Sequence, residues 1–198
     1  MPRPPDPAKR RDLLDQVRHY MIRNGLADLS LRPLARALGT SDRMLLYYFG
    51  TKERLVADAL ALDENRPLLR AADLLDTLGR PEDPAGVRRF MEQVWRLFNT
   101  PDRRALLPLS LEVMAASLLH PDRYGPLMHD VITGWTRMLT SVFRDLGMAE
   151  ARAHTEATLL VDATFGLILA PLADGDWNRA EAAFQSLLDR LEPGWQTT

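Results

Sequence analysis

The sequence predicts an all-α protein, and three observations favour this fold class. Leucine and alanine dominate, with 35 Leu and 23 Ala against 8 Val and 3 Ile, and side chains that are not branched at Cβ favour helices over strands. No stretch shows the sustained alternation of apolar and polar residues that is typical of a half-buried strand. Several segments instead repeat apolar residues every three or four positions. A hydrophobic content of 46% over 198 residues is enough for a sizeable core.

The composition also excludes several classes of protein. The chain has no cysteine, so it has no disulfide framework, thiolate zinc site or cysteine nucleophile. The N-terminal segment MPRPPDPAKRRD lacks the apolar region of a signal peptide, and no run reaches about 18 apolar residues. Phosphate-binding loops, nucleophile elbows and zinc-protease motifs are also missing from the sequence. We therefore expect a cytoplasmic, non-enzymatic protein with no membrane span, cofactor or metal.

Charge is distributed unevenly along the chain. Residues 1–54 carry 11 Lys and Arg against 6 Asp and Glu, a balance of +5, while residues 55–198 carry 14 against 21, a balance of -7. A basic N-terminal part joined to an acidic remainder fits contact with a polyanion such as DNA. It equally fits a solvated surface, so charge alone does not decide between the two.

The N-terminal part reads as an arm followed by short helices. Residues 1–7 are rich in proline and predict a flexible arm. Residues 8–24 have apolar side chains at helical spacing, and Gly25 is placed to end that helix. Ser30 can cap a second helix over residues 31–38, with Pro33 in its first turn.

A tight turn separates the second helix from a third. Gly39 and Thr40 form the predicted turn, and Ser41 can cap a helix that runs to about Phe49. Lys52 then opens a longer fourth helix that ends before Pro67. Two short helices joined by a glycine-containing turn and braced by a preceding helix are typical of a helix-turn-helix unit.

The segment LSLRPLARALGTSDRMLLYYFGTKERL (residues 29–55) resembles the DNA-binding domain of TetR-family transcriptional regulators. The resemblance lies in the capped second helix with a central Leu-Ala, the Gly-x-Ser turn, the Tyr-Phe end of the third helix and the following Thr-Lys-Glu. It implies a helix-turn-helix domain over residues 8–52 and a larger helical ligand-binding and dimerisation domain over residues 53–198.

The third helix is expected to enter the major groove of DNA. Side chains near its N-terminus then face base edges, and Arg43 can donate two hydrogen bonds to a guanine. Asp42 can accept from a cytosine or simply favour the helix N-terminus. Thr40 and Ser41 offer donors to phosphates. The predicted DNA-binding residues are Arg32, Thr40, Ser41, Asp42, Arg43, Met44, Tyr47, Tyr48 and Lys52.

Some of these roles come from the resemblance alone. It implies a base contact for Arg32 and backbone contacts for Tyr47, Tyr48 and Lys52, although Tyr48 fits a core position equally well. The sequence departs from the family pattern at Arg43-Met44, where a small pair is common, and at Leu46, which replaces an aromatic and is expected to pack inward. The arm and the start of the first helix can add further contacts through Arg3, Lys9, Arg10 and Arg11.

The rest of the chain predicts further helices. One covers residues 68–78, and the next carries an apolar stripe that includes Phe90 and Met91. Thr100 and Pro101 open a helix that runs to about Leu119, and Pro108 is expected to kink it.

Two late helices, at about 124–146 and 150–172, are candidates for a dimer interface. Residues 157–172 are apolar on nearly every side, so a second subunit is expected to cover the face that the monomer leaves open. The resemblance implies a four-helix dimer bundle and two helix-turn-helix units that read a pseudo-palindromic, double-stranded operator. Asp162 interrupts this apolar run and needs a partner, which can be a partner subunit, a core network or a ligand.

Aromatic and thioether side chains in the helical body suit an adaptable apolar pocket, and they suit an ordinary core as well. The predicted ligand-binding residues are Phe90, Met91, Trp95, Phe98, Met114, Trp135, Asp162 and Phe165. The resemblance implies a repressor that a small, largely apolar molecule releases from DNA. The alternative is a helical small-molecule-binding protein or adaptor without a DNA role, which would not explain residues 29–55.

Overall fold

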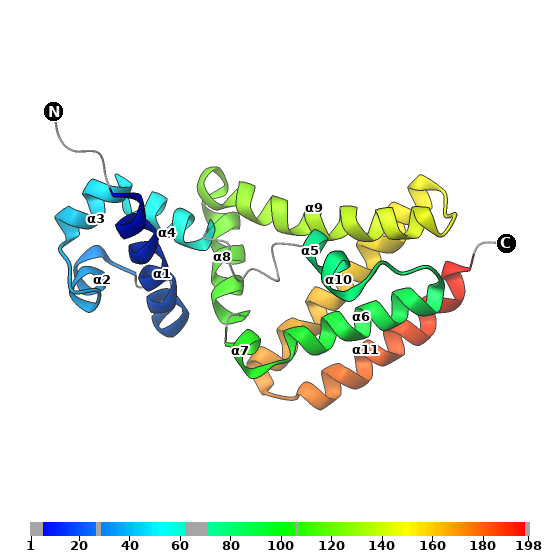
Figure 1. Cartoon of the computed structure of the whole chain (residues 1–198). Helices are drawn as coiled ribbons and strands as arrows, with labels where there is room; N and C mark the ends of the chain where they lie inside the picture. Colours follow the sequence, from blue (N-terminus) through cyan, green and yellow to red (C-terminus); the bar gives the residue numbers. More distant parts are fainter. Residues whose placement is uncertain (1–5, 27–28, 62–70, 106, 197–198) are drawn as a thin grey trace. The chain divides into compact units, whose positions relative to one another are not determined.

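The computed structural model describes residues 6–26, 29–61, 71–105 and 107–196. All regular elements within these ranges are helices (Figure 1), which confirms the predicted fold class. The first four are α1 (Pro7–Asn24), α2 (Leu31–Ala37), α3 (Asp42–Phe49) and α4 (Lys52–Ala61). Next come α5 (Ala71–Leu78), α6 (Pro84–Phe98), α7 (Pro101–Arg104) and α8 (Leu107–Leu119). The last are α9 (Pro121–Asp145), α10 (Glu150–Asp174), α11 (Trp177–Leu191) and the short 3-10 helix η1 (Glu192–Trp195).

The chain packs as two compact units. Unit 1 consists of Met1–Asn65 and Ala105–Met128, and unit 2 consists of Arg66–Arg104 and His129–Thr198. Unit 1 thus combines α1–α4, which we call the head, with α8 and the first turns of α9. Most of the predicted arm, at residues 1–5, lies outside the described residues.

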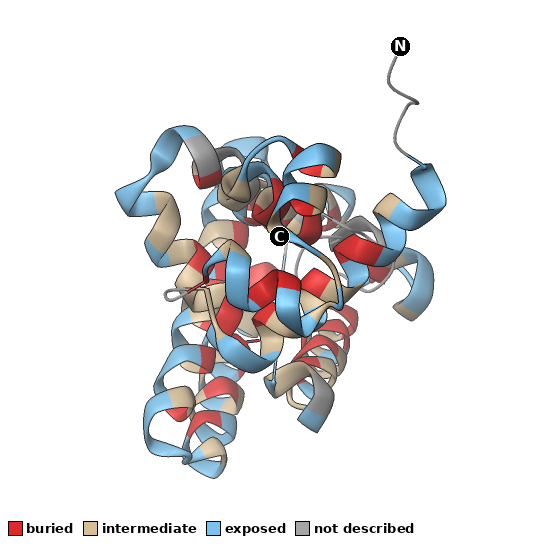
Figure 2. Cartoon of the chain, turned by 90° about the vertical axis from the view of Figure 1, so that its left-hand side faces the viewer, coloured by how far each residue is buried: buried red, intermediate tan, exposed pale blue. Residues whose placement is uncertain are grey.

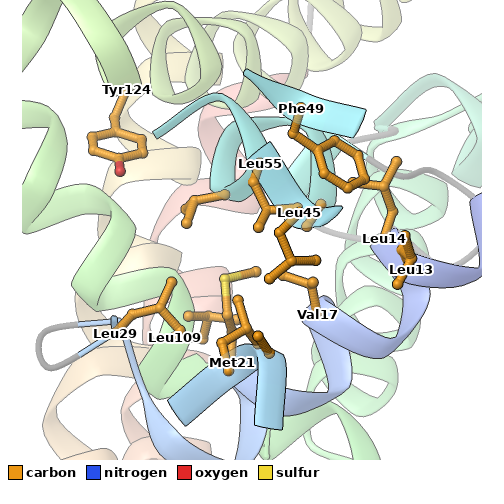
Figure 3. Packing of buried hydrophobic residues seen from close by; sticks show 14 residues of the cluster. Leu13, Leu14, Val17, Met21, Leu29, Leu45, Phe49, Leu55, Leu109 and Tyr124 are labelled. Carbon is orange, nitrogen blue, oxygen red and sulfur yellow. The ribbon is translucent and has the colours of Figure 1, made fainter. Parts of the chain in front are cut away.

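Unit 1 has a single core cluster centred on α1 (Figure 3). Val17, Met21 and Leu34 are 0% exposed, because the apolar stripe of α1 faces α2, α3 and α4 across one interior. Figure 3 shows Val17, Met21 and Leu45 gathered in this cluster. The same cluster includes Leu109 of α8 and Tyr124 of α9. The head therefore shares its core with α8 and the first turns of α9. We call this part of unit 1, residues 107–128, the α8–α9 corner.

The ends of α1 follow from its sequence. The Asp6 carboxylate accepts from the backbone N–H of Ala8 at 2.9 Å and so caps the N-terminus. At the other end Gly25 has φ 76°, a conformation that glycine adopts without steric cost. Its N–H donates to the Met21 carbonyl at 2.8 Å. Ser30 stands at the N-cap of α2 as predicted, but its side chain makes no capping hydrogen bond there.

The expected kink at Pro108 does not occur. The predicted helix from Pro101 to Leu119 is instead two helices, because α7 ends at Arg104 and α8 begins at Leu107. Pro108 therefore occupies the second position of α8, where a backbone N–H has no intrahelical acceptor and its absence costs nothing. The proline starts a helix here and does not bend one.

In unit 2, α6 and α11 lie side by side (Figure 1). The Trp95 ring stacks on Phe184, with centroids 4.3 Å apart and planes 8° from parallel. At one end of this pair, Arg88 donates to Asp189 at 2.7 Å and Glu192 at 3.2 Å. The hydrogen bond that Arg88 donates to Asp189, together with those to Glu192 and Glu92, raises the pKa of the Arg88 guanidinium. The contacts tie α6 to the C-terminal segment.

Helices of the chain carry both buried and exposed residues (Figure 2), and the two sides of α10 differ in this way. One side is buried and carries Ala153, Ala157, Leu160, Val161, Thr164 and Ile168. The other is exposed and carries Leu159, Asp162, Gly166, Leu169, Ala170 and Ala173 at helical spacing. Among the described residues, α10 is the one helix whose length and composition would allow it to cross a membrane. A core helix of a soluble protein meets the same criteria.

Candidate nucleic-acid interface

The turn between α2 and α3 is built by backbone hydrogen bonds. The N–H of Thr40 donates to the Ala35 carbonyl at 2.9 Å, and Gly39 has φ 64°, which a side chain would strain. Ser41 then caps α3, because its hydroxyl oxygen accepts from the Met44 N–H at 3.2 Å. The turn and the cap fix the direction in which α3 leaves α2.

One face of α3 is buried and the opposite face is exposed. Leu45 and Phe49 pack into the core of unit 1. Arg43, Leu46 and Tyr47 share the exposed face, since they stand three and four positions apart. Leu46 is 41% exposed and Tyr47 47% exposed. The expectation that Leu46 packs inward is therefore wrong, and the face offers one cation, one aliphatic and one aromatic side chain.

Arg32 and Asp42 come together at the N-terminal ends of α2 and α3. Their nearest side-chain atoms, Arg32 Nε and Asp42 Oδ2, are 4.0 Å apart, with the side chains 88% and 49% exposed. Solvent screens such a pair, so it adds little to stability. The other carboxylate oxygen of Asp42 accepts from the Arg43 N–H at 3.0 Å. Asp42 thus contacts the side chain of Arg32 and the backbone of Arg43, two residues that we predict to approach bases.

The two tyrosines of α3 differ in their surroundings. Tyr47 and Tyr48 form a T-shaped pair with ring centroids 5.3 Å apart. Tyr48 is half-buried, packs against the core cluster and has its ring 6.2 Å from that of Phe49. Tyr47 is the more exposed of the two. Tyr48 therefore helps to anchor α3 on the head, and Tyr47 lies on the exposed face.

Lys52 stands at the start of α4 and is half-buried. Its ammonium group donates to the Leu29 carbonyl at 3.0 Å, which ties α4 to the segment that enters α2. Thr51 caps this helix by accepting from the Arg54 N–H at 3.1 Å. The Lys52 ammonium group has three N–H donors. If it also contacted a phosphate, the phosphate would share these donors with the Leu29 carbonyl.

The basic residues at the start of α1 are not equivalent. Arg10 is bonded to Asp58 of α4, and its guanidinium lies 5.1 Å from the centroid of the Phe49 ring. These contacts hold α1, α3 and α4 together. Lys9 and Arg11 are exposed on α1, and Arg3 lies outside the described residues.

Sequence reasoning missed one cation at this surface. Arg36 is exposed and stands one helical turn after Arg32 on α2, so helical spacing alone was enough to find it. With Arg43, these residues give the α2–turn–α3 surface three exposed guanidinium groups. Such groups bind phosphate oxygens and guanine edges through paired donors.

The predicted ligand-binding residues do not form one group. Phe90, Met91, Trp95 and Phe98 are buried on α6, and the Phe98 ring lies 5.8 Å from that of Trp135. Phe165 is half-buried in the same unit, whereas Asp162 is exposed on α10. Met114 belongs to α8 in unit 1. The structure therefore brings together the aromatic residues of α6 and α9 but not the whole predicted set.

A cavity of about 380 Å³ lies within unit 1, beside the head. Leu26, Lys52, Glu112, His120 and Tyr124 are among the residues that line it. It is formed by residues of α4, α8, the start of α9 and the segment after α1. Nothing in the order of these residues along the chain indicated that they meet.

Comparisons with known proteins agree with this architecture. Residues 13–59 match the family model of the TetR-family bacterial regulatory proteins. A transcriptional regulator from Rhodococcus sp. Rha1 has a similar fold, with a TM-score of 0.72 and 21% identity over 96% of this chain and 97% of its own. GusR of Salmonella enterica gives a TM-score of 0.65 and 20% identity over 97% of each chain. No curated protein matches the sequence.

The family match covers α1 to α4 and therefore includes every helix of the head. The solved structures extend the likeness in fold to nearly the whole chain. Residues 13–59 are therefore similar to the DNA-binding domain of TetR-family bacterial regulatory proteins.

Proposed function

We propose that the protein is a homodimeric repressor of the cytoplasm, which reads a pseudo-palindromic operator through α3 and leaves it when a small, largely apolar molecule binds. The main support for DNA binding through α3 is the exposed face of this helix. Ser41 caps the helix, Leu45 and Phe49 anchor it, and Arg43 projects from the opposite side. A capped, anchored helix with an exposed guanidinium near its N-terminus fits major-groove recognition.

The α2–turn–α3 surface divides naturally into positioning and reading residues. Thr40 and Ser41 suit phosphate contacts because they lie at the start of a helix, where N–H groups face outward. Arg43 and Met44 suit base contacts, and Asp42 can accept from a cytosine amino group. Arg32, Tyr47, Tyr48 and Lys52 complete the proposed interface. The domain division at residues 8–52 and 53–198 is part of the same proposal.

The dimer part is supported by the exposed side of α10. Leu159 is 48% exposed and Leu169 36% exposed, and the small residue Gly166 lies between them. On α9, Ile132 is 40% exposed. Covering these side chains with the same helices of a second subunit would bury apolar surface at little steric cost, because glycine allows close helix approach. The interface accounts for the apolar character of α10 without a membrane, and Asp162 within it argues against a span.

The aromatic interior of unit 2 is the proposed binding site of the small molecule. We place an apolar molecule next to the Phe98–Trp135 pair and the half-buried Phe165, since aromatic rings provide large adaptable contact areas. Release from DNA requires that this molecule bind better to the conformation that does not fit the operator. The proposal contains no catalytic step.

Arg43 provides the sharpest test of the DNA-binding proposal. A duplex selected from a random library by the purified protein serves as operator, and its affinity is measured by fluorescence anisotropy. The variant Arg43→Ala should lose about 10- to 100-fold in operator affinity, because a bidentate guanine contact contributes about 1–3 kcal/mol. Arg43→Lys keeps the charge but not the paired donors and should recover only part of the loss.

The matched control is Arg190→Ala, which removes an exposed guanidinium from α11. It should leave operator affinity within about twofold of the unmodified protein. If Arg43→Ala kept its circular dichroism spectrum and bound the operator as well as Arg190→Ala, α3 would not be the reading helix. Another surface of the chain would then have to carry operator recognition.

A further inference from the structure

A polar contact joins α8 to the end of α1 within unit 1. The backbone N–H of Leu26 donates to the carboxylate of Glu112, and 86 positions separate the two residues in the sequence. Gly25 lies against the same carboxylate. A Cβ on residue 25 would lie 2.7 Å from Oε1 and 3.3 Å from Oε2 of Glu112. Glycine at position 25 is favoured by its φ of 76°, and a larger residue there would displace the Glu112 carboxylate.

This bond lies between the core cluster of unit 1 and a cavity beside it. Leu109 and Tyr124, each 7% exposed, pack from α8 and α9 into the core of the head. On the other side, Leu26 and Glu112 both line the cavity of about 380 Å³. Loss of the bond would enlarge an existing cavity and would not open one in the packed core. The apolar contacts hold the corner on the head, and the Glu112 bond restricts how far it can turn.

The position of the Glu112 carboxylate suits a hydrogen-bond acceptor better than a negative charge. The carboxylate lies at the C-terminal end of α1, where the helix dipole disfavours a negative charge. The Leu26 N–H compensates by donating to it. A glutamine side chain can accept the same hydrogen bond without that electrostatic cost.

We propose that Glu112 is a positioning residue that fixes the head on the α8–α9 corner and thereby sets the separation of the DNA half-sites that the dimer accepts. This inference rests on the proposed function. α9 begins in unit 1 at Pro121, and its later residues belong to unit 2, which carries the proposed dimer surface. A head held rigidly on the start of that helix fits one half-site spacing. A head that can turn fits several.

The test uses the full-length protein and a set of duplexes that carry the selected half-sites. The set comprises the selected spacing and spacings longer or shorter by one and two base pairs. Each base pair moves a half-site about 3.4 Å along the axis and about 35° around it. The measured quantity is the ratio of Kd at an altered spacing to Kd at the selected spacing.

We expect the unmodified protein to prefer one spacing and Glu112→Ala to reduce that preference by about tenfold, the equivalent of one hydrogen bond to a charged group. Gly25→Ala should have a similar effect, since its Cβ displaces the carboxylate from the opposite side. Glu112→Gln should retain the preference of the unmodified protein. Hydrogen exchange of the Leu26 amide, followed by NMR, should be faster in Glu112→Ala than in Glu112→Gln.

Three results would overturn the proposal. The first is a spacing preference in Glu112→Ala equal to that of the unmodified protein. The second is an equal change in Glu112→Ala and Glu112→Gln, which would assign the effect to charge. The third is a loss of affinity by the same factor at all spacings, as expected of a merely stabilising residue. If Glu112→Ala did not fold, Gly25→Ala and Glu112→Gln would decide. Failure of the unmodified protein to bind any spacing specifically would instead contradict the proposed function.

Discussion

Replacing Trp95 with alanine should destabilise the protein by about 3–5 kcal/mol, the usual cost of removing a large aromatic side chain from a core. Trp95 is 1% exposed, stacks on Phe184 at 4.3 Å and donates its indole N–H to Glu181. Urea unfolding followed by circular dichroism would measure the change. The substitution removes both the stack and the hydrogen bond, and the space left between α6 and α11 cannot close without moving a helix.

The variant Trp95→Phe is the matched control for the stacking contribution. It keeps an aromatic ring against Phe184 and loses the N–H that Glu181 accepts. We expect it to recover more than half of the stability lost in Trp95→Ala. A cost below about 1 kcal/mol for Trp95→Ala would contradict the assignment of this side chain to a packed core. It would favour a residue that lines an open ligand site.

The variant Gly166→Arg should leave the subunit folded and abolish the dimer. A Cβ on residue 166 meets no heavy atom within 4 Å, and arginine has a higher helix propensity than glycine. The monomer should therefore be at least as stable as before. Across the proposed interface, however, the long charged side chain would prevent close approach of two α10 helices. Sedimentation equilibrium would measure the loss of the dimer.

Loss of the dimer should weaken operator binding by about 100-fold or more, because two linked heads bind far more tightly than one. Ala182→Arg is the control, since it adds the same side chain to an exposed position of α11. It should leave both the oligomeric state and operator affinity unchanged. A Gly166→Arg protein that remained dimeric would place the interface elsewhere and contradict the role given to the exposed side of α10.

Much of the fold was accessible from local sequence patterns. The bounds of α1, α2 and α3, the cap at Ser41 and the helix end at Gly25 depend on neighbouring residues, so short-range rules predicted them. The predicted end of the fourth helix before Pro67 lies outside the described residues. Leu46 was expected to pack inward but is exposed. The expectation failed because the apolar character of a residue does not determine which face of a short helix contacts the core. The expectation for Pro108 failed because a proline is equally compatible with a kink and with a new helix start.

Other features depend on segments far apart in the chain. Glu112 meets the end of α1 across 86 positions, and no local rule connects an acidic residue of α8 with a glycine-containing helix end. The engagement of Arg10 with Asp58 and Phe49 is likewise a consequence of packing. Sequence reasoning treated Arg10 as a possible DNA contact because it could see the charge of that residue but not its neighbours.

We expect this chain to bind one DNA sequence in preference to others. The most direct measurement is fluorescence anisotropy of the purified protein against labelled duplexes that tile the DNA upstream of its own gene, with a scrambled competitor and a salt series. We expect saturable binding to one tile, at least about 10³-fold tighter than to the scramble, that weakens steeply as salt rises. Weak and equal binding to every tile, and no enriched sequence in a selection from genomic fragments, would contradict the account.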